Sequence, residues 1–529
     1  MGTVGIVAFW GMMRTAPITK PCVPCILHED RHLVVVHKPA GISTHRAGED
    51  APWGMVEFLS SQRPDLGGLG IHQRLDRETS GVLIFARSPE ANRALADQFQ
   101  NRSVRKRYLL VTKSGAPQNI FTVAKPVDDK PAKTHFRYLR EIPSGFLWEA
   151  EPITGRTHQV RLHAAACGIP IVGETDNLKS PLETLLLHAA KLEIIHPQNG
   201  QPLMLEAPMP AYFEMSDSEQ RRFAAACNLR QLLIDPKETN AYRLIHRESD
   251  GFPQLTVDRL SSWFYVEDFC GRGDATWLSK AALGFDETKG IICSEVIQGA
   301  QRENKRLLWG EPPPKDFAIL ENGIRYQLDL LLPGSIGLFL DQRENRRRIK
   351  SLAGGLRVLN LFACTCGFSV AATMGGAIET VNVDLSRRAL EWGRQNFRIN
   401  GLDPSLHHFW AQDVTETLRK LASRKERFGV VIIDPPSSSR SKSSGHFSVK
   451  KDLGKLTRAA APLIDEDGWL FVSSNLAGWK NSAFLVVLEK EIHSAGRKIM
   501  ERVWMPQPFD FPACRDCPAY LKSVWLRLE

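Results

Sequence analysis

The sequence contains no hydrophobic run long enough to cross a membrane, and cysteine is sparse, with ten among 529 residues. A membrane-spanning helix needs about 20 consecutive apolar residues, so no membrane partner is expected. Cysteines at so low a density do not form the framework of a disulfide-rich secreted domain. Residues 1–20 include a short apolar stretch with no basic region before it, which makes a poor secretory signal. These absences predict a cytoplasmic protein with reduced thiols.

Two cysteine pairs nevertheless have the C-x-x-C spacing of metal ligands, Cys22 with Cys25 and Cys514 with Cys517. Four thiolates could form a tetrahedral zinc site. The pairs lie at opposite ends of the chain and each is flanked by proline. Unrelated cysteines near loop ends are therefore the favoured interpretation, and no metal is expected.

The composition is that of a globular protein, with 43% hydrophobic and 24% charged residues. A chain of 529 residues is too long for one core, so two or three domains are expected. The formal net charge is +9. A basic surplus favours a polyanionic partner, with nucleic acid ahead of an anionic membrane.

The first half of the chain mixes strand and helix patterns, which predicts an α+β domain. Ser88 and Pro89 suit the N-cap and first position of a helix over residues 88–102. Residues 146–168 predict a strand, a loop and a helix whose start carries His158, Arg161 and His163. Further strands are expected at 33–38, 81–87 and 106–113.

From residue 357 the pattern changes to short apolar strands that alternate with helices, as in RVLNLFACTCG, ETVNVDLS and FGVVIIDPP. This alternation predicts a doubly wound, Rossmann-like α/β domain. The serine-rich residues 437–445 predict a mobile loop. We expect an N-terminal extension at 1–23, an α+β domain at 24–212, a linker helix with an amphipathic pattern at 213–234, a small α/β domain at 235–330 and the doubly wound domain at 331–529.

The segment HQRLDRETSG, residues 72–81, places Arg74 and Asp76 directly before a hydrophobic strand. Alone, it would be interpreted as a charged turn. With the motifs HKPAGIST, KRYLLV, ITGRTHQVRLHAAACGIPIVGE and LLLHAAKLEI in order around it, residues 24–210 resemble the catalytic domain of RluA-type pseudouridine synthases. Gln73 stands where many members have histidine, and the family's N-terminal S4 RNA-binding domain is absent.

The resemblance implies Asp76 as the catalytic carboxylate, Tyr108 stacked on uracil, Arg161 paired with Asp76, and Arg74 as the base-flipping arginine. These residue types suit the isomerisation of uridine to pseudouridine. The uridine must leave its helix before an enzyme can reach the glycosidic bond. An arginine can fill the vacated stack, and a paired arginine stabilises an ionised carboxylate. Cleavage, rotation of the uracil and re-bonding through carbon-5 follow, and no cofactor is implied.

The second half carries carboxylates at the ends of successive predicted strands: Asp384, Asp413, and Asp434 in IIDPPSSS. A carboxylate after a glycine-containing turn suits ribose hydroxyls, and Asp413 suits an adenine edge. With NAYRLIHRESDGFPQLTVDRL and IGLFLDQRENRRRI before it, the region from 235 onward resembles the RlmI and RlmK types of large-subunit ribosomal RNA methyltransferase, without their PUA domain. The resemblance implies S-adenosylmethionine as cofactor, Gln342 as a further cofactor or RNA contact, and a binding set of Phe362, Gly367, Asp384, Asp413, Asp434 and Arg343.

The segment FVSSN, residues 471–475, helps to identify the atom that receives the methyl group. Cytosine carbon-5 methylation needs a cysteine thiolate, which relatives carry in the segment corresponding to FVSSN, where this chain has Ser473, Ser474 and Asn475. A guanine nitrogen-7 has a free lone pair and needs only placement, which favours that acceptor with Asp434 and Asn475 as site residues. Cys364 and Cys366 are interpreted as packing residues, while a role for Cys514 or Cys517 stays open.

The expected partner is RNA, 23S ribosomal RNA or its precursor, and no DNA. Without S4 or PUA domains, basic surface at Arg102, Arg105, Lys106, Arg107 and residues 346–348 is expected to supply the affinity. Three alternatives remain beside a bifunctional enzyme that methylates guanine. The first is an active synthase with methylation at carbon-5 of cytosine, and the second is an active synthase with a methyltransferase fold reduced to RNA binding. The third is a non-enzymatic ribosome assembly factor.

Overall fold

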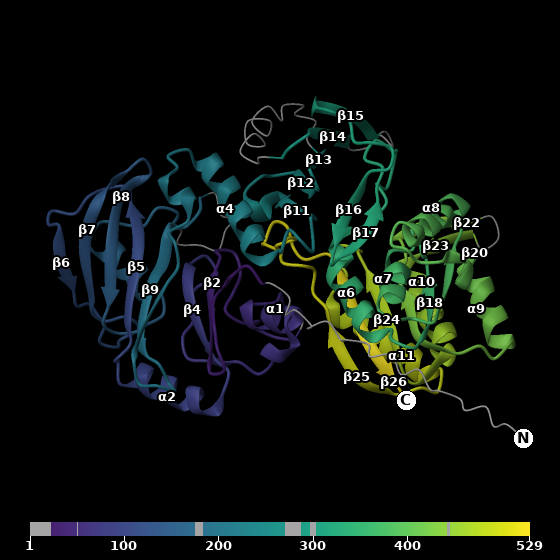
Figure 1. The fold of residues 1–529 in the computed structure, drawn as a ribbon, viewed down its shortest axis with the longest axis horizontal. Helices are drawn as coiled ribbons and strands as arrows, with labels where there is room; N and C mark the ends of the chain where they lie inside the picture. The colour runs from purple at the N-terminus through teal and green to yellow at the C-terminus, as the bar shows by residue number, and fades with distance from the viewer. Residues whose placement is uncertain (1–22, 50, 175–182, 270–286, 297–302, 442–444) are drawn as a thin grey trace, which may run out of the picture.

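The computed structural model describes residues 23–49, 51–174, 183–269, 287–296, 303–441 and 445–529. Most of the predicted N-terminal extension, including Cys22, lies outside this part of the chain. Within it, no helix is both long and apolar enough to span a membrane. Figure 1 shows the N-terminal half in purple and blue on one side and the C-terminal half in green and yellow on the other.

The N-terminal half is built on one mixed sheet in the order β1-β2-β4-β9-β5-β8-β7-β6, with β3 against β4 and β10 against β9. Helices α1 (Met55–Gln62), α2 (Pro89–Gln100) and α3 (Gln159–Ala166) accompany it. The strands are β1 (Ile26–Glu29), β2 (Leu33–Lys38), β3 (Gly70–Ile71), β4 (Ser80–Ala86), β5 (Arg105–Thr112), β6 (Ile120–Val123), β7 (Thr134–Ile142), β8 (Gly145–Pro152), β9 (Leu187–Ile195) and β10 (Pro202–Glu206). The α+β prediction is confirmed.

Local sequence signals explain these elements. Every residue of β2 and β4 is buried, which accounts for their near-continuous apolar runs. Helix α2 begins at Pro89, and the Ser88 hydroxyl caps it by accepting from the Ala91 N–H at 3.1 Å. The predicted strands and the α2 N-cap are therefore confirmed.

Helix α4 (Ser218–Leu233) joins two hydrophobic cores. Leu229 and Leu233 pack with β2 and β4, whereas Phe223 and Cys227 belong to the core of the next domain. The fully buried Arg230 donates to both carboxylate oxygens of Asp250. The sequence predicted a linker helix with one apolar face, but α4 is buried on several sides.

The next region forms a sheet in the order β11-β12-β13-β14-β15, followed by the hairpin β16-β17. Its strands are β11 (Ala241–His246), β12 (Leu255–Leu260), β13 (Trp263–Asp268), β14 (Gly290–Val296), β15 (Glu303–Gly310), β16 (Ala318–Glu321) and β17 (Ile324–Gln327). The β13–β14 pair is parallel and the others are antiparallel.

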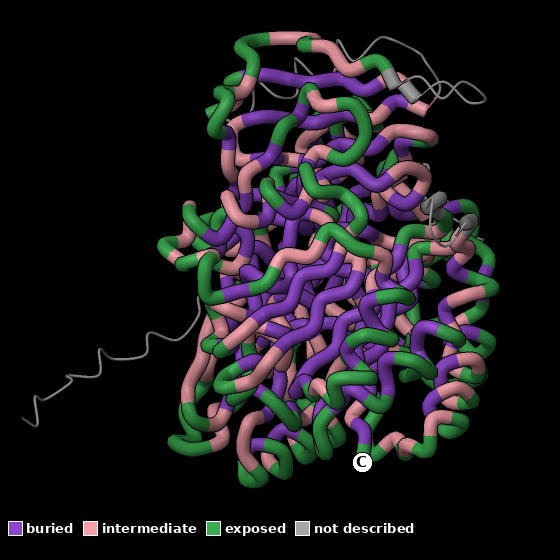
Figure 2. Tube along the Cα trace, turned by 90° about the vertical axis from the view of Figure 1, so that its right-hand side faces the viewer, coloured by how far each residue is buried: buried purple, intermediate pink, exposed green. Residues whose placement is uncertain are grey.

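The C-terminal sheet has the order β20-β19-β18-β21-β24-β26-β25, and only the pairs that involve β26 are antiparallel. Figure 2 shows buried strands at the centre of this half and exposed residues around them. The strands are β18 (Arg357–Leu361), β19 (Glu379–Asp384), β20 (His408–Ala411), β21 (Phe428–Ile433), β24 (Ile464–Ser474), β25 (Ile499–Trp504) and β26 (Lys522–Leu528). The helices are α6 (Arg343–Leu352), α7 (Gly367–Met374), α8 (Arg387–Arg398), α9 (Val414–Ser423), α10 (Val449–Ala460) and α11 (Asn481–Ser494). The doubly wound prediction is confirmed.

The serine-rich segment after β21 differs from its prediction. Strands β22 (Ser438–Ser441) and β23 (Gly445–Ser448) pair antiparallel where a loop was expected. The main-chain ladder satisfies backbone polar groups that a loop would leave to water.

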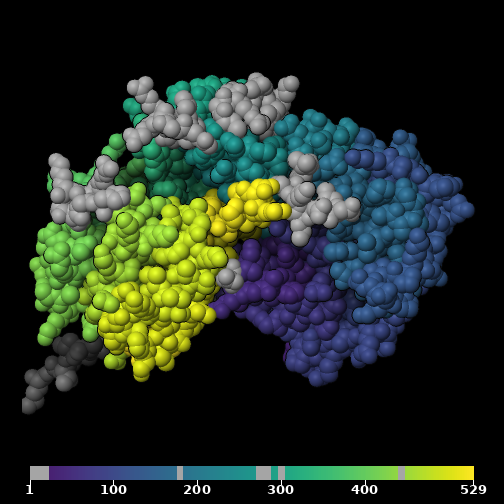
Figure 3. Space-filling view, turned by 180° about the vertical axis from the view of Figure 1, so that it is seen from behind, coloured from purple at the N-terminus to yellow at the C-terminus, as the bar shows by residue number. Residues whose placement is uncertain are grey.

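The connection between β25 and β26 reaches from the C-terminal half to the N-terminal half. Its Phe509 packs edge-on against Phe58 of α1, with ring centroids 5.4 Å apart. Arg502 also pairs with Glu49 at 3.1 Å. In Figure 3 the yellow C-terminal residues project against the teal surface and over the purple one. The two halves are thus joined by contacts beyond α4.

Candidate active sites

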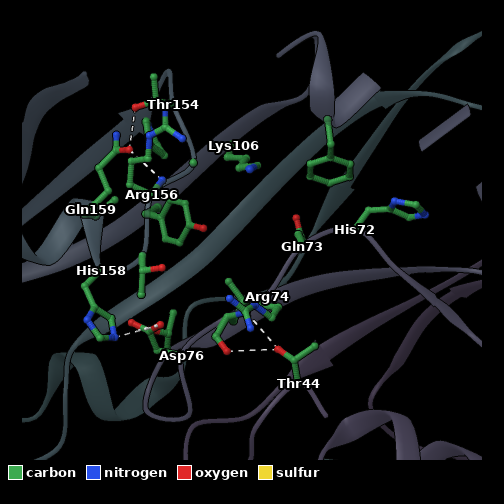
Figure 4. Close-up of a pocket in the computed structure, with 18 of the residues that line it drawn as sticks. Thr44, His72, Gln73, Arg74, Asp76, Lys106, Thr154, Arg156, His158 and Gln159 are labelled. Carbon is green, nitrogen blue, oxygen red and sulfur yellow. Dashed lines mark hydrogen bonds and ion pairs between the residues drawn. The ribbon is translucent and has the colours of Figure 1, made fainter. Parts of the chain in front are cut away.

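The first site is a cavity of 870 Å³ in the N-terminal half. Its wall comes from the loop after β2, the loop before β4, strand β5, and the loop that leads into α3. These elements bring Tyr108 and Arg161 to Arg74 and Asp76, which share one segment of the sequence. Figure 4 shows Asp76, Arg74 and His158 around the same space.

Asp76 is held by groups from α3 and the residue before it. Arg161 Nη1 donates to Asp76 Oδ2 at 3.2 Å, and His158 Nε2 lies 3.5 Å from Oδ1. Arg161 also donates through Nε and Nη2 to Glu174, at 2.9 and 2.6 Å. The hydrogen bonds to Glu174, and to a smaller extent the one to Asp76, raise the pKa of Arg161. A permanently charged arginine therefore fixes the carboxylate in the cavity.

Tyr108 lies on β5 and presents an aromatic ring to the cavity. Burial, and secondarily the charge of Asp76, raises the pKa of Tyr108 well above its usual range, so the phenol stays neutral. A neutral ring in this position can stack on a pyrimidine. Arg74 is exposed in the cavity wall, where its guanidinium can reach a base or a phosphate.

Sequence reasoning assigned no role to Glu174, although the quoted motif GIPIVGE contains it. The arginine is shared between Glu174 and Asp76, and only the folded chain shows which carboxylate it orients. Gln73, the departure from the family pattern, donates to the Val82 carbonyl at 3.0 Å.

The basic surface is present in one of its two predicted places. Arg102 is exposed in the wall of the first cavity, and Lys106 lines it with its ammonium 5.0 Å from the Phe99 ring centre. Arg105 is exposed but does not line the cavity, and Arg107 is half-buried and pairs with Glu193 at 3.2 Å. The prediction was wrong for residues 346–348. Arg346 is buried against Glu321 at 2.6 Å, Arg347 pairs with Glu344, and Arg348 lies over the Trp469 ring.

RNA affinity should fall steeply as salt rises, because neutralised phosphates release counterions. Replacing Arg102 and Arg105 by alanine should lower the slope of log affinity against log salt by about two if each arginine meets one phosphate. Binding of RNA to the full chain at several salt concentrations measures this slope. An affinity that barely changes between low and physiological salt would contradict the expectation.

The second site is a cavity of 400 Å³ at the carboxyl ends of β18, β19, β20 and β21. This edge is where open α/β sheets bind ligands. Of the residues expected from the sequence, the cavity is lined by Phe362, Gly367, Asp384, Asp413, Asp434, Asn475 and Gln342.

Arg343 is placed elsewhere. Its guanidinium is buried and donates to both carboxylate oxygens of Asp510, at 2.9 and 2.5 Å. It does not line the cavity, so the expected contact with cofactor or RNA gives way to a contact between α6 and the C-terminal connection. Charge alone could not show this, because the partner lies 167 residues away.

Two carboxylates that line the cavity, Asp384 and Asp413, are oriented by backbone N–H groups. Asp384 accepts from the N–H of Cys364 at 2.9 Å and from that of Ser386 at 2.8 Å. Asp413 caps α9 by accepting from the N–H of Thr415 at 2.9 Å. Both carboxylates also face the cavity, where they can accept from hydroxyl or amino groups.

Asp434 directly follows β21 and is half-buried. Ser473 and Gln342 both donate to its Oδ1, the latter at 3.1 Å. The described residues supply no donor to Oδ2, which leaves that oxygen for a ligand. Burial raises the pKa of Asp434 to about 6, against the opposing effect of the Ser473 hydrogen bond.

The segment after Asp434 and the end of β24 form the wall beside it. Ser437 donates to the Asn475 side-chain oxygen at 2.7 Å, which fixes the amide. Ser474 is buried, and its hydroxyl accepts from the Leu476 N–H at 3.3 Å. Cys364 lines the cavity, but burial raises its thiol pKa to about 11. Cys514 and Cys517 lie outside this cavity.

The residues present suit S-adenosylmethionine. Asp384 and Asp413 offer acceptors for ribose and adenine groups, and Phe362 and Phe447 add aromatic walls, with ring centroids 5.6 Å apart. At Gly367 an added Cβ would lie 3.0 Å from Leu338. Glycine therefore keeps this turn open, as a cofactor pocket at a helix N-terminus requires. The described residues hold no cluster of three or more metal-ligating side chains.

Comparisons with known proteins match both halves of the chain to families. Residues 32–166 match the model of RNA pseudouridylate synthase, and residues 293–527 match that of S-adenosylmethionine-dependent methyltransferase. The ribosomal RNA large subunit methyltransferase I of Aeromonas salmonicida is 33% identical over 317 residues, which cover 58% of this chain and 79% of that protein. Its counterpart from Escherichia coli strain SMS-3-5 is 32% identical over 319 residues, which cover 58% and 80%.

Solved structures support the methyltransferase fold. A Streptococcus mutans protein described as an S-adenosylmethionine-dependent methyltransferase is 27% identical, with a TM-score of 0.52, over 64% of this chain and 87% of that one. A methyltransferase in complex with SAH gives the same values.

Proposed function

The chain belongs to the S-adenosylmethionine-dependent methyltransferase family, with an RNA pseudouridylate synthase domain ahead of it, and from this premise we propose that both of its sites modify large-subunit ribosomal RNA. We assign residues 24–212 to pseudouridine formation, 235–330 to an accessory domain and 331–529 to methyl transfer. The N-terminal extension precedes residue 24, and α4 lies within the connection at 213–234. The observation that carries the proposal is the presence of two separate cavities, each with an oriented carboxylate, on one chain.

In the first site, Asp76 acts on the flipped uridine, Tyr108 stacks on its ring, and Arg161 holds the carboxylate. Arg74 occupies the space that the base leaves in its helix. Because Glu174 takes two donors of Arg161, the remaining Nη1 is aimed at Asp76.

In the second site, the methyl acceptor is nitrogen-7 of guanine. The cofactor supplies an electrophilic methyl group. The protein's part is placement, with Asp434 and the two prolines after it beneath the base and Asn475 at its edge. Ser474 in place of a cysteine, together with the raised pKa of Cys364, favours transfer without a covalent RNA intermediate.

Large-subunit ribosomal RNA transcribed with 5-fluorocytidine tests this assignment, because it traps thiolate-based enzymes as stable adducts. We expect no denaturation-resistant protein–RNA adduct from this chain, whereas a cytosine carbon-5 methyltransferase run beside it gives one. An adduct that disappears when a single cysteine is replaced would establish the cytosine reaction instead. Nucleoside mass mapping of the same RNA after reaction identifies both products.

A further inference from the structure

A third cavity, of 1140 Å³, lies between the two halves of the molecule. It meets the first cavity at the catalytic carboxylate, since Asp76, His158 and Arg161 line both. The other walls come from α4, through Arg222, Ala225 and Leu229, and from the C-terminal connection, through Pro512, Cys514 and Arg515. The methyltransferase half therefore borders the synthase site.

The border is held by direct contacts. Arg77, the residue after Asp76, donates through Nη2 to the Ala513 carbonyl at 3.3 Å and through Nε to the Gly41 carbonyl at 3.1 Å. Three residues before Ala513, Asp510 accepts from Arg343 and from the backbone N–H of Arg243. These contacts fix the connection beside the loop that carries the catalytic carboxylate.

Five carboxylates and four arginines line this cavity, and each of the carboxylates is paired with a cation. The pairs are Asp76 and Glu174 with Arg161, Glu78 with Arg77, Glu183 with Lys113, and Asp250 with Arg230. Arg515 is exposed in the wall, and no described carboxylate lies within ion-pair distance of its guanidinium. A guanidinium in this state is a ready partner for an RNA phosphate.

We infer that residues 509–517 of the methyltransferase half form one wall of the RNA-binding cleft of the synthase, and that Arg515 is a positioning residue for a phosphate next to the target uridine. The flipped nucleotide occupies the first cavity, and the strand that flanks it continues past Asp76 into the third. This inference rests on the proposed synthase activity.

The test measures pseudouridine formation by the full-length chain on large-subunit ribosomal RNA transcribed in vitro. Arg515→Ala should raise KM about 5- to 10-fold, the effect of one lost charged contact, with kcat within about twofold. Its salt slope for RNA binding should fall by about one. Arg515→Lys, which keeps the charge, should retain most of the affinity. Arg419→Ala, an exposed arginine on α9 outside all three cavities, is the matched control.

Equal KM and equal salt slope in Arg515→Ala and Arg419→Ala would overturn the inference. A fall in kcat with an unchanged salt slope would also overturn it, because a structural role would then explain the effect. A wild-type chain that forms no pseudouridine would instead refute the proposed function, and the inference with it.

Discussion

Asp76→Asn is expected to lower pseudouridine formation by about 10³- to 10⁴-fold, the scale on which loss of a catalytic side chain acts. The amide keeps the size of the carboxylate but cannot carry its negative charge. Arg161 would then face a neutral group at 3.2 Å and keep only its pairing with Glu174. Pseudouridine content of the product RNA, measured by nucleoside mass spectrometry, reports the loss.

Methylation by the same variant should stay near the wild-type rate, because Asp76 lies in a different cavity from the cofactor residues. Asp97→Asn is the matched control, since Asp97 is exposed on α2 and lines neither cavity. Near wild-type pseudouridine formation in Asp76→Asn would show that another group performs the reaction. A parallel loss of methylation would indicate misfolding rather than a catalytic role.

Local sequence chemistry predicted those elements whose cause lies within a few residues. Ser88 and Pro89 start α2 because the cap and the first turn need only neighbouring atoms. The strands of the doubly wound sheet were equally visible, since each is an apolar run that ends in a polar turn. Asp384, Asp413 and Asp434 converge because the carboxyl ends of neighbouring parallel strands lie along one edge.

The errors concern charged residues whose partners are distant in sequence. The run RENRRR looks like an exposed basic helix face, yet Arg343 and Arg346 are buried by Asp510 and Glu321, 167 and 25 residues away. Burying an arginine is tolerated only when its partner is in place. No local pattern supplies that partner, and the same reason hid the link from Arg161 to Glu174.

The role of α4 was missed for a related reason. Phe223, Leu229 and Arg230 are spread around α4, so the single apolar face that the amphipathic pattern predicted is not what the helix buries. It is stable because two domains cover it on different sides, which becomes apparent only when both are folded.

Asp434→Ala is expected to lower methylation by about 10²- to 10³-fold while pseudouridine formation continues. The substitution removes Oδ2 from the cavity and leaves the donors of Ser473 and Gln342 without their acceptor. Methyl transfer depends on holding the acceptor nitrogen in line with the departing sulfur, so loss of this placement falls on the chemical step. Transfer of a radiolabelled methyl group to RNA measures the rate. Glu416→Ala, an exposed change on α9, is the control.

The pH dependence of the methylation rate distinguishes the effect of the Asp434 charge from the effect of its shape. Because its pKa is raised to about 6, the carboxylate becomes protonated as pH falls through that value, well above the range of an ordinary aspartate. If the ionised form is required, methylation by the wild type should rise with pH through about 6 and level off above about 7, as titration of a single group dictates. Asp434→Asn keeps an acceptor for Ser473 and Gln342 but cannot titrate. Its methylation rate should therefore be lower than that of the wild type and should not rise with pH through about 6. A step that persists in the variant would assign the titration to another group.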